Sequence, residues 1–283
     1  MRIDLDTFLG PTATRPIEEL ANVERNGGVY IQCWNFKDDF PGFGFLRYCG
    51  EVTHISMLVR PDRSAKIDFS SVPLPELVEH IDIDGGRQGR DRGQAIPLTG
   101  IGTICGLSHL HNLKNLKLSD FPALTFEDAL LPASLQKLAI FNPGKLNIQS
   151  VPETSAPHID LLGFDQRHVR DYGFISGFSG MEVLWMNYCN GMEALPAFHP
   201  KVKIREVGVC KARRLKNIEV LAEHEGIEEV AFRFCPLLTI EDFRCLQKLP
   251  KLKRFYVSNR KEEEAIRGLF PDIEIILDRL TSG

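Results

Sequence analysis

LWMNYC (184–189) and VAFRFC (230–235) follow one pattern: apolar, any residue, apolar, any residue, aromatic, cysteine. Their first residues lie 46 positions apart, and VGVCKA, which begins at Val207, stands 23 residues from each. An apolar residue at every second position is typical of a strand that buries one face. A constant spacing of roughly 20–50 residues between such stretches indicates a chain built from stacked repeats.

The same register extends over a longer part of the chain. Seven second apolar positions follow one another at intervals of 21 to 25 residues: Leu118, Ile140, Leu161, Met186, Val209, Phe232 and Val257. Looser matches occur at 52–57 and 78–83, and 273–277 has the composition of a last strand. Seven residues after two of these positions the chain reads TFED (125–128) and TIED (239–242). A threonine N-cap followed by acidic residues favours a helix start, so we predict units that run strand, loop, capped helix and return loop.

This pattern resembles the leucine-rich-repeat family, in which LxxLxL precedes a turn and a helix, over roughly residues 105–260. The sharpest unit, IEEVAFRFCPLLTIEDFRCLQKLPKLKRFYV, is similar to the cysteine-containing subtype, with Cys189 and Cys235 three residues after the second strand apolar. Other units depart from the subtype at that position, where they carry Phe121, Pro143, Phe164 or Ala212.

The resemblance implies an α/β solenoid: an arc with a parallel concave sheet, and with short helices and loops on its convex side. Residues 1–44 show no repeat, although 29–36 alternates like a strand, and we interpret them as an N-terminal cap that shields the first repeat. The solenoid then covers 45–283. The glycine- and arginine-rich stretch at 85–94 breaks the register and predicts an insertion at about 84–103.

Burying Leu184 and Met186 places Trp185 on the opposite, concave face. The same phase, with the residue after each strand, predicts a partner-binding surface of Phe141, Leu162, Trp185, Tyr188, Arg233, Phe234, Arg254 and Tyr256. Trp, Tyr and Arg dominate the energetics of protein interfaces, and exposed apolar clusters rimmed by charge mark binding sites. Two alternatives stay open: a loop such as 84–103 covers Trp185, or Tyr188 and Phe234 turn inward.

The charge balance argues against a general nucleic-acid binder. The chain has 34 basic and 38 acidic residues, for a net charge of -4. Residues 201–216 are a local exception, with seven basic residues against Glu206 alone, and nucleic-acid binding through this segment is the alternative function. The other interpretation is a solvated edge answered by the acidic run at 219–229.

The seven cysteines are an odd set without close spacing, which favours free thiols in a reducing cytoplasm. The N-terminus has no apolar signal region, and no run of about 18 apolar residues predicts a membrane span. Cys105, His109 and His111 lack a matching second ligand pair for zinc. No nucleophile elbow or phosphate loop is recognisable, so we expect no catalytic residues, no metal and no cofactor.

These observations predict a non-catalytic module that binds another protein through its concave face. By analogy with compact repeat proteins that lack an effector domain, the expected role is an intracellular inhibitor, such as an immunity protein that blocks a toxin, or an adaptor.

Overall fold

The computed structural model describes residues 2–4, 15–16, 19–20, 28–33, 42–59, 65–85, 101–121, 123–127, 131–141, 146–147, 158–162, 172–258 and 260–277. These residues form parallel sheets with few helices, an α/β repeat-like fold. The chain divides into two compact units, unit 1 (Met1–Thr154) and unit 2 (Ser155–Gly283).

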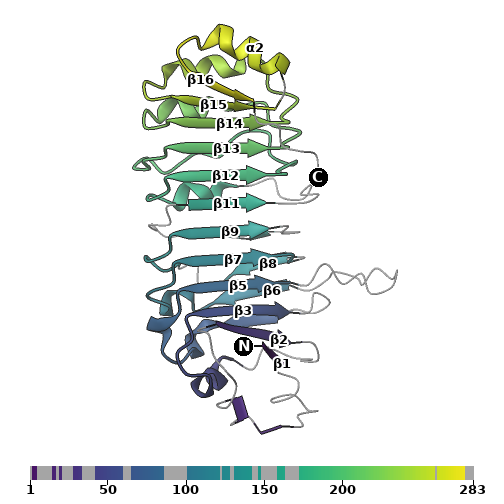
Figure 1. Ribbon diagram of the computed structural model, residues 1–283, viewed down its shortest axis with the longest axis vertical. Coiled ribbons are helices and arrows are strands. Elements are labelled where there is room, and N and C mark those ends of the chain that lie inside the picture. Colours follow the sequence, from purple (N-terminus) through teal and green to yellow (C-terminus); the bar gives the residue numbers. More distant parts are fainter. Residues whose placement is uncertain are drawn as a thin grey trace, which may run out of the picture. The chain divides into compact units, whose positions relative to one another are not determined.

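Unit 1 contains two parallel sheets (Figure 1). The strands of the first sheet, in spatial order, are β1 (Arg2–Asp4), β2 (Gly28–Cys33), β3 (His54–Val59), β5 (His80–Asp84), β7 (Asn115–Ser119) and β9 (Lys137–Phe141). Those of the second are β10 (Leu146–Asn147), β8 (Ala123–Phe126), β6 (Ile101–Cys105) and β4 (Ala65–Asp68). Short 3-10 helices connect them: η2 (Gly44–Tyr48), η3 (Phe69–Ser71), η4 (Pro75–Leu77) and η5 (Leu107–His109).

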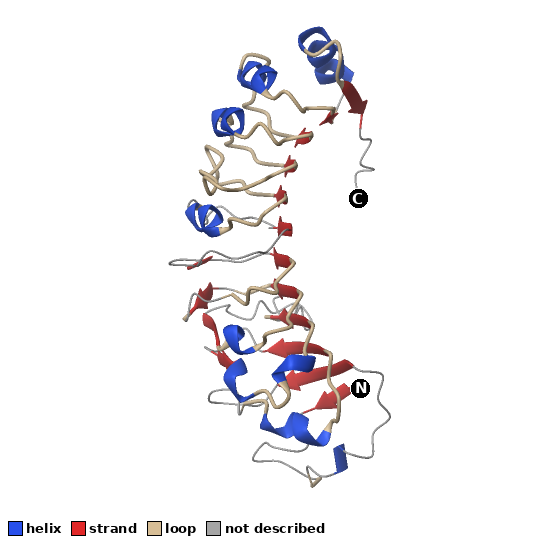
Figure 2. Ribbon diagram, turned by 90° about the vertical axis from the view of Figure 1, so that its left-hand side faces the viewer, coloured by secondary structure: helices blue, strands red, loops and turns tan. Residues whose placement is uncertain are grey.

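Unit 2 has one strand per repeat, and neighbours in sequence pair directly. Its strands are β11 (His158–Leu162), β12 (Val183–Asn187), β13 (Glu206–Cys210), β14 (Glu229–Arg233), β15 (Arg254–Val257) and β16 (Glu274–Leu277). Its helices are η6 (Gly173–Gly177), η7 (Glu219–Glu223), η8 (Asp242–Lys248) and α2 (Arg260–Leu269). The 3-10 helices of unit 2 lie on one side of the strands (Figure 2).

The predicted repeat register is confirmed in the strand pairing. Met186 lies opposite Val209, and Val209 opposite Phe232, so equivalent apolar positions stand side by side in β12, β13 and β14. In β12 the residues Leu184 and Met186 are fully buried, as the alternation predicts. The same ladder in unit 1 pairs Leu118 with Ile140.

The residue that follows a strand adopts a left-handed backbone in three successive repeats. Tyr188, Lys211 and Phe234 have φ of 55°, 57° and 54°. Phe234 is 46% exposed, so it does not turn inward, and the next residue, Cys235, is buried instead. Non-glycine residues rarely adopt this backbone, which persists where the surrounding structure holds it. These turns direct one side chain outward before the chain enters the core.

The two predicted capped helices have different outcomes. TIED (239–242) leads into η8, but Thr239 donates from its backbone N–H and its hydroxyl to Asp242 Oδ2, at 2.7 and 2.8 Å, and caps no helix N–H. The helix predicted at 125–128 is wrong, because Thr125 and Phe126 belong to strand β8. Leu124 and Phe126 alternate with half-buried neighbours there, and β8 pairs with β6 in the second sheet.

The N-terminal segment joins the first sheet of unit 1. Ile31 in β2 lies opposite Met57 in β3, so the domain boundary predicted at residue 44 separates two strands that pair directly. The insertion predicted at about 84–103 ends within β6, and its central residues, 86–100, lie outside the described part of the chain. Residues 34–36 of the predicted strand at 29–36 also lie outside it.

Candidate functional site

The side of the unit 2 sheet that carries Trp185, Gly208, Ala231 and Tyr256 is here called the open face. These four residues lie opposite one another in β12, β13, β14 and β15. The Trp185 ring lies directly over Gly208, where a Cβ atom would overlap it. Trp185 Nε1 donates to Glu206 Oε1 at 2.8 Å. The indole is therefore half-buried against the next strand, and no loop is needed to explain its position.

Arg233 lies between two aromatic rings on the open face. Its guanidinium carbon is 5.5 Å from the ring centroid of Trp185 and 5.5 Å from that of Tyr256. Although predicted as a rim cation, Arg233 is only 8% exposed. The small residues Gly208 and Ala231 leave a hollow between the rings, and the guanidinium fits there with cation–π attraction on both sides. We call this arrangement the Trp185–Arg233–Tyr256 stack.

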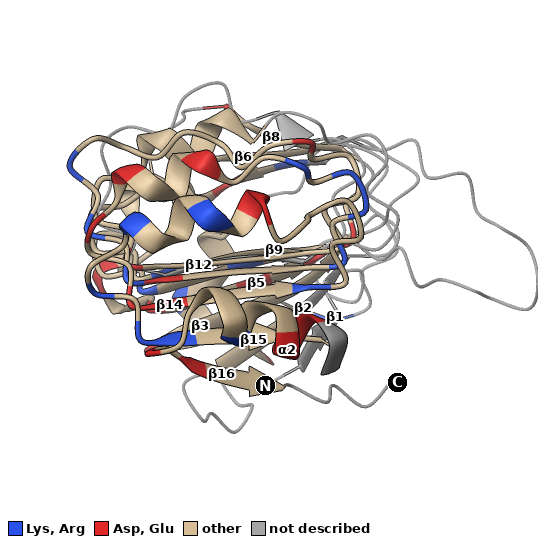
Figure 3. Ribbon diagram, turned by 90° about the horizontal axis from the view of Figure 1, so that it is seen from above, with Lys and Arg blue, Asp and Glu red and all other residues tan. Residues whose placement is uncertain are grey.

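Carboxylates hold the stack at the edge where the strands begin. Glu229 accepts a hydrogen bond from Tyr256 Oη at 3.2 Å and forms an ion pair with Arg254. Desolvation, with the nearby Glu229 carboxylate, raises the pKa of Tyr256, so this phenol stays neutral and donates at physiological pH. Acidic and basic residues alternate along this edge of β14, β15 and β16 (Figure 3). The stack is therefore a preorganised surface rather than a set of loose side chains.

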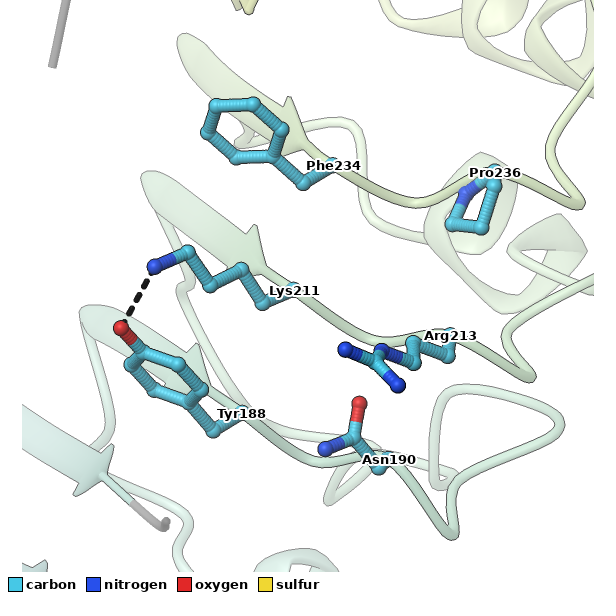
Figure 4. A pocket seen from close by; sticks show the side chains of 6 residues that line it. All are labelled: Tyr188, Asn190, Lys211, Arg213, Phe234 and Pro236. Atoms are coloured by element: carbon cyan, nitrogen blue, oxygen red, sulfur yellow. Dashed lines mark hydrogen bonds between the residues drawn. The ribbon is translucent and has the colours of Figure 1, made fainter. Parts of the chain in front are cut away.

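A pocket of about 450 Å³ opens where β12, β13 and β14 end, and we call it the exit pocket. Its lining residues are Tyr188, Asn190, Lys211, Arg213, Phe234 and Pro236 (Figure 4). Lys211 Nζ lies 4.4 Å from the Tyr188 ring centroid and donates to its hydroxyl at 2.5 Å. This hydrogen bond raises the pKa of Lys211, so the ammonium is charged at neutral pH.

The structure brings together most of the predicted surface residues. Trp185, Arg233, Arg254 and Tyr256 share the open face, while Tyr188 and Phe234 line the exit pocket. The two remaining residues are Phe141 and Leu162. Phe141 belongs to unit 1, where Lys117 Nζ is 5.7 Å from its ring centroid. Leu162 ends β11 opposite Asn187, and its side chain lies outside the described residues.

Sequence reasoning missed four lining residues of the exit pocket: Asn190, Lys211, Arg213 and Pro236. The signal was present for Lys211, which stands 23 residues after Tyr188 and 23 before Phe234. In the sequence, Lys211 also belongs to the basic segment 201–216.

The basic segment 201–216 is divided between the two ends of β13. Arg205 pairs with Glu182 at 3.2 Å, while Arg214 and Lys216 both pair with Glu193, Lys216 at 3.2 Å. Of the acidic run that we expected to answer these cations, Glu228 and Glu229 form ion pairs with Lys253 and Arg254. The segment therefore presents no continuous basic stripe.

The groups considered for metal or thiol chemistry are buried or scattered. Cys105 Sγ contacts the Ile67 carbonyl at 3.8 Å, and the rings of His109 and His111 lie 6.0 Å apart. Within the described ranges, no group of three or more His, Cys, Asp or Glu side chains is placed to hold a metal ion. Burial raises the pKa of the Cys189 and Cys235 thiols to about 12, so neither is a poised nucleophile at neutral pH.

Comparisons with known proteins add little to this geometry. No protein-family model matches the chain, and no curated protein matches it. Among solved structures, an LRR protein of Leptospira interrogans is similar over 92% of this chain and 91% of its own, with 12% identity and a TM-score of 0.26. That likeness is too weak to support an assignment. Among the residues that the structure describes, no helix has the length and apolar character needed to cross a membrane.

Proposed function

We propose that this chain is a non-catalytic protein-binding module, a leucine-rich-repeat-like arc whose concave surface includes the open face of unit 2. The Trp185–Arg233–Tyr256 stack carries the proposal. Trp, Tyr and Arg are the residue types that contribute most to protein interfaces, and they act best when surrounded by groups that exclude water. Here Glu206 and Glu229 already hold the rings, so a partner would meet a surface that loses little side-chain freedom on binding.

The finer proposal is an inhibitory role, such as that of an immunity protein covering a toxin's active site, or an adaptor role. The mixed charges at the edge of the open face suit a partner chosen by shape and aromatic contact rather than by charge alone. The thiols of Cys189, Cys235 and Cys245 form no disulfide, which supports a reducing compartment as the site of action.

The test is affinity capture from lysate of the source organism, followed by binding measurements with the purified captured protein. Replacing both Trp185 and Tyr256 with alanine is expected to weaken binding at least a hundredfold, since two interface anchors of about 2 kcal/mol each are lost. Tyr48→Ala is the matched control, because Tyr48 is also a half-buried tyrosine beside an arginine, Arg47, but lies in unit 1. Equal binding by all three proteins would contradict the proposal.

Salt dependence separates this function from the nucleic-acid alternative. Binding through phosphate contacts of residues 201–216 would weaken by several powers of ten between about 50 and 200 mM salt. A complex anchored by the Trp185–Arg233–Tyr256 stack is expected to weaken far less over that range.

A further inference from the structure

The exit pocket lies beyond the open face and differs from it in chemistry. Tyr188, Lys211 and Phe234, the three left-handed residues, project side by side from three adjacent strands (Figure 4). Their backbone N–H groups are already used: Tyr188 N donates to Cys210 O and Lys211 N to Arg233 O, both at 2.7 Å, and Phe234 N to Ser258 Oγ at 3.2 Å. The side chains, not the backbone, therefore determine what this pocket binds.

Positive charge dominates the exit pocket. Arg213 is exposed, Lys211 is half-buried, and none of the six described lining side chains is acidic. The chain as a whole has a net charge of -4, so this concentration of cations is local. Lysine carries three N–H donors, and the Tyr188 hydroxyl accepts one, so two donors of Lys211 remain for a ligand. The pocket therefore favours an anion.

The remaining lining groups require more than an inorganic ion. Phe234 and Pro236 are exposed at the rim, and the Tyr188 ring forms an apolar wall. A complete ligand thus combines an anion with an apolar group.

We propose that the exit pocket binds a peptide segment of the protein partner in which an aspartate or glutamate stands beside an aromatic residue. The carboxylate meets Lys211 and Arg213, and the aromatic ring packs against Phe234 and Tyr188. A pocket of about 450 Å³ accommodates two such side chains. This inference rests on the proposed protein-binding function and names the chemistry of the partner.

A phosphate group fits the exit pocket less well than a carboxylate. Phosphate sites are commonly built from clustered backbone N–H groups, and those of Tyr188, Lys211 and Phe234 are already hydrogen-bonded. Arginine also pairs with a carboxylate through two parallel hydrogen bonds, which gives Arg213 a directional role.

The test uses the full chain and three blocked dipeptides, titrated by ligand-observed NMR or calorimetry. N-acetyl-Asp-Phe-amide is the expected ligand, N-acetyl-Asn-Phe-amide is its uncharged isostere, and the phosphoserine analogue presents a phosphate. We expect the aspartate peptide to bind at least about tenfold more tightly than the asparagine peptide, the effect of one charged hydrogen bond. Arg213→Gln should reduce that preference to less than about threefold.

Arg205→Gln is the matched control, because Arg205 is also exposed but pairs with Glu182 at the other end of β13. It should keep the full preference. Equal binding of the aspartate and asparagine peptides, equal effects of the two arginine variants, or tighter binding of the phosphoserine peptide would each overturn the proposal. These titrations involve no partner protein. If the peptides show no aspartate preference while partner capture still depends on Trp185, only the pocket assignment is refuted. If the peptides show the preference while capture does not depend on Trp185, only the open-face function is refuted.

Discussion

Gly208→Ala tests whether the Trp185 ring occupies the position described here. An added Cβ would lie 2.6 Å from Trp185 Cδ2 and closer still to Cε3, against a normal contact of about 3.5–4.0 Å. The ring must move, which also disturbs its 2.8 Å hydrogen bond to Glu206. Overpacking of this kind typically costs about 1–3 kcal/mol, and we expect the free energy of unfolding to fall by that amount.

The effect of Gly208→Ala on the free energy of unfolding should change sign once the Trp185 ring is removed. In a Trp185→Ala background the new methyl group has room, and alanine restricts the unfolded chain more than glycine does, which stabilises by about 0.4–1 kcal/mol. The coupling between the two positions is therefore expected at about 1.5–4 kcal/mol. Urea unfolding followed by far-ultraviolet circular dichroism measures all four proteins without relying on indole fluorescence.

A coupling near zero would refute the reasoning, because it would mean that the ring does not lie over Gly208. A Trp34→Phe background leaves Trp185 as the single indole. In that background, Gly208→Ala should shift the fluorescence emission to longer wavelength as the ring moves toward water.

Three further outcomes follow from the described contacts. Because burial raises the pKa of the Cys189 and Cys235 thiols from 9.0 to about 12, the unfolded chain loses these protons first. Stability should therefore fall as pH rises above about 9, by about 1.4 kcal/mol per thiol at pH 10, and alanine at both positions should flatten the denaturation-midpoint profile. Phe255→Ala should cost about 3–5 kcal/mol in urea unfolding, since its fully buried ring contacts Phe232, Phe243 and Phe270. Phe234→Asn should raise the free energy of unfolding by about 0.5–1 kcal/mol, because asparagine tolerates the left-handed backbone. The same variant should bind the aspartate peptide more weakly, and a loss of stability would contradict this account.

The repeat register could be predicted because each strand of unit 2 buries alternate apolar residues at a nearly constant interval. Periodicity identifies which side of a strand a residue occupies, and it placed Trp185 correctly opposite Leu184 and Met186. Periodicity does not show how deeply a side chain is buried on that side of the strand. Arg233 is buried because Ala231 on its own strand and Gly208 on the neighbouring strand are too small to fill the space between two rings.

The helix error at 125–128 has a related cause. Thr125 and Phe126 suit an extended strand as well as a helix start, and strand β6 supplies a partner for the extended form. The sequence of β8 alone cannot reveal that partner, because β6 follows residues that break the register. Four lining residues of the exit pocket were missed for another reason. Asn190, Lys211, Arg213 and Pro236 follow three different strands, where apolar alternation has already ended.

The left-handed residue at the end of each of three strands has a consequence for how such a chain diversifies. Neighbouring strands lie about 4.8 Å apart, so these residues form a row of evenly spaced positions along the sheet edge. Tyrosine, lysine and phenylalanine occupy the three points with nearly the same φ, between 54° and 57°. The backbone there tolerates different side chains. Binding specificity in a lineage of such proteins can therefore change by substitution in one repeat at a time while the fold stays the same.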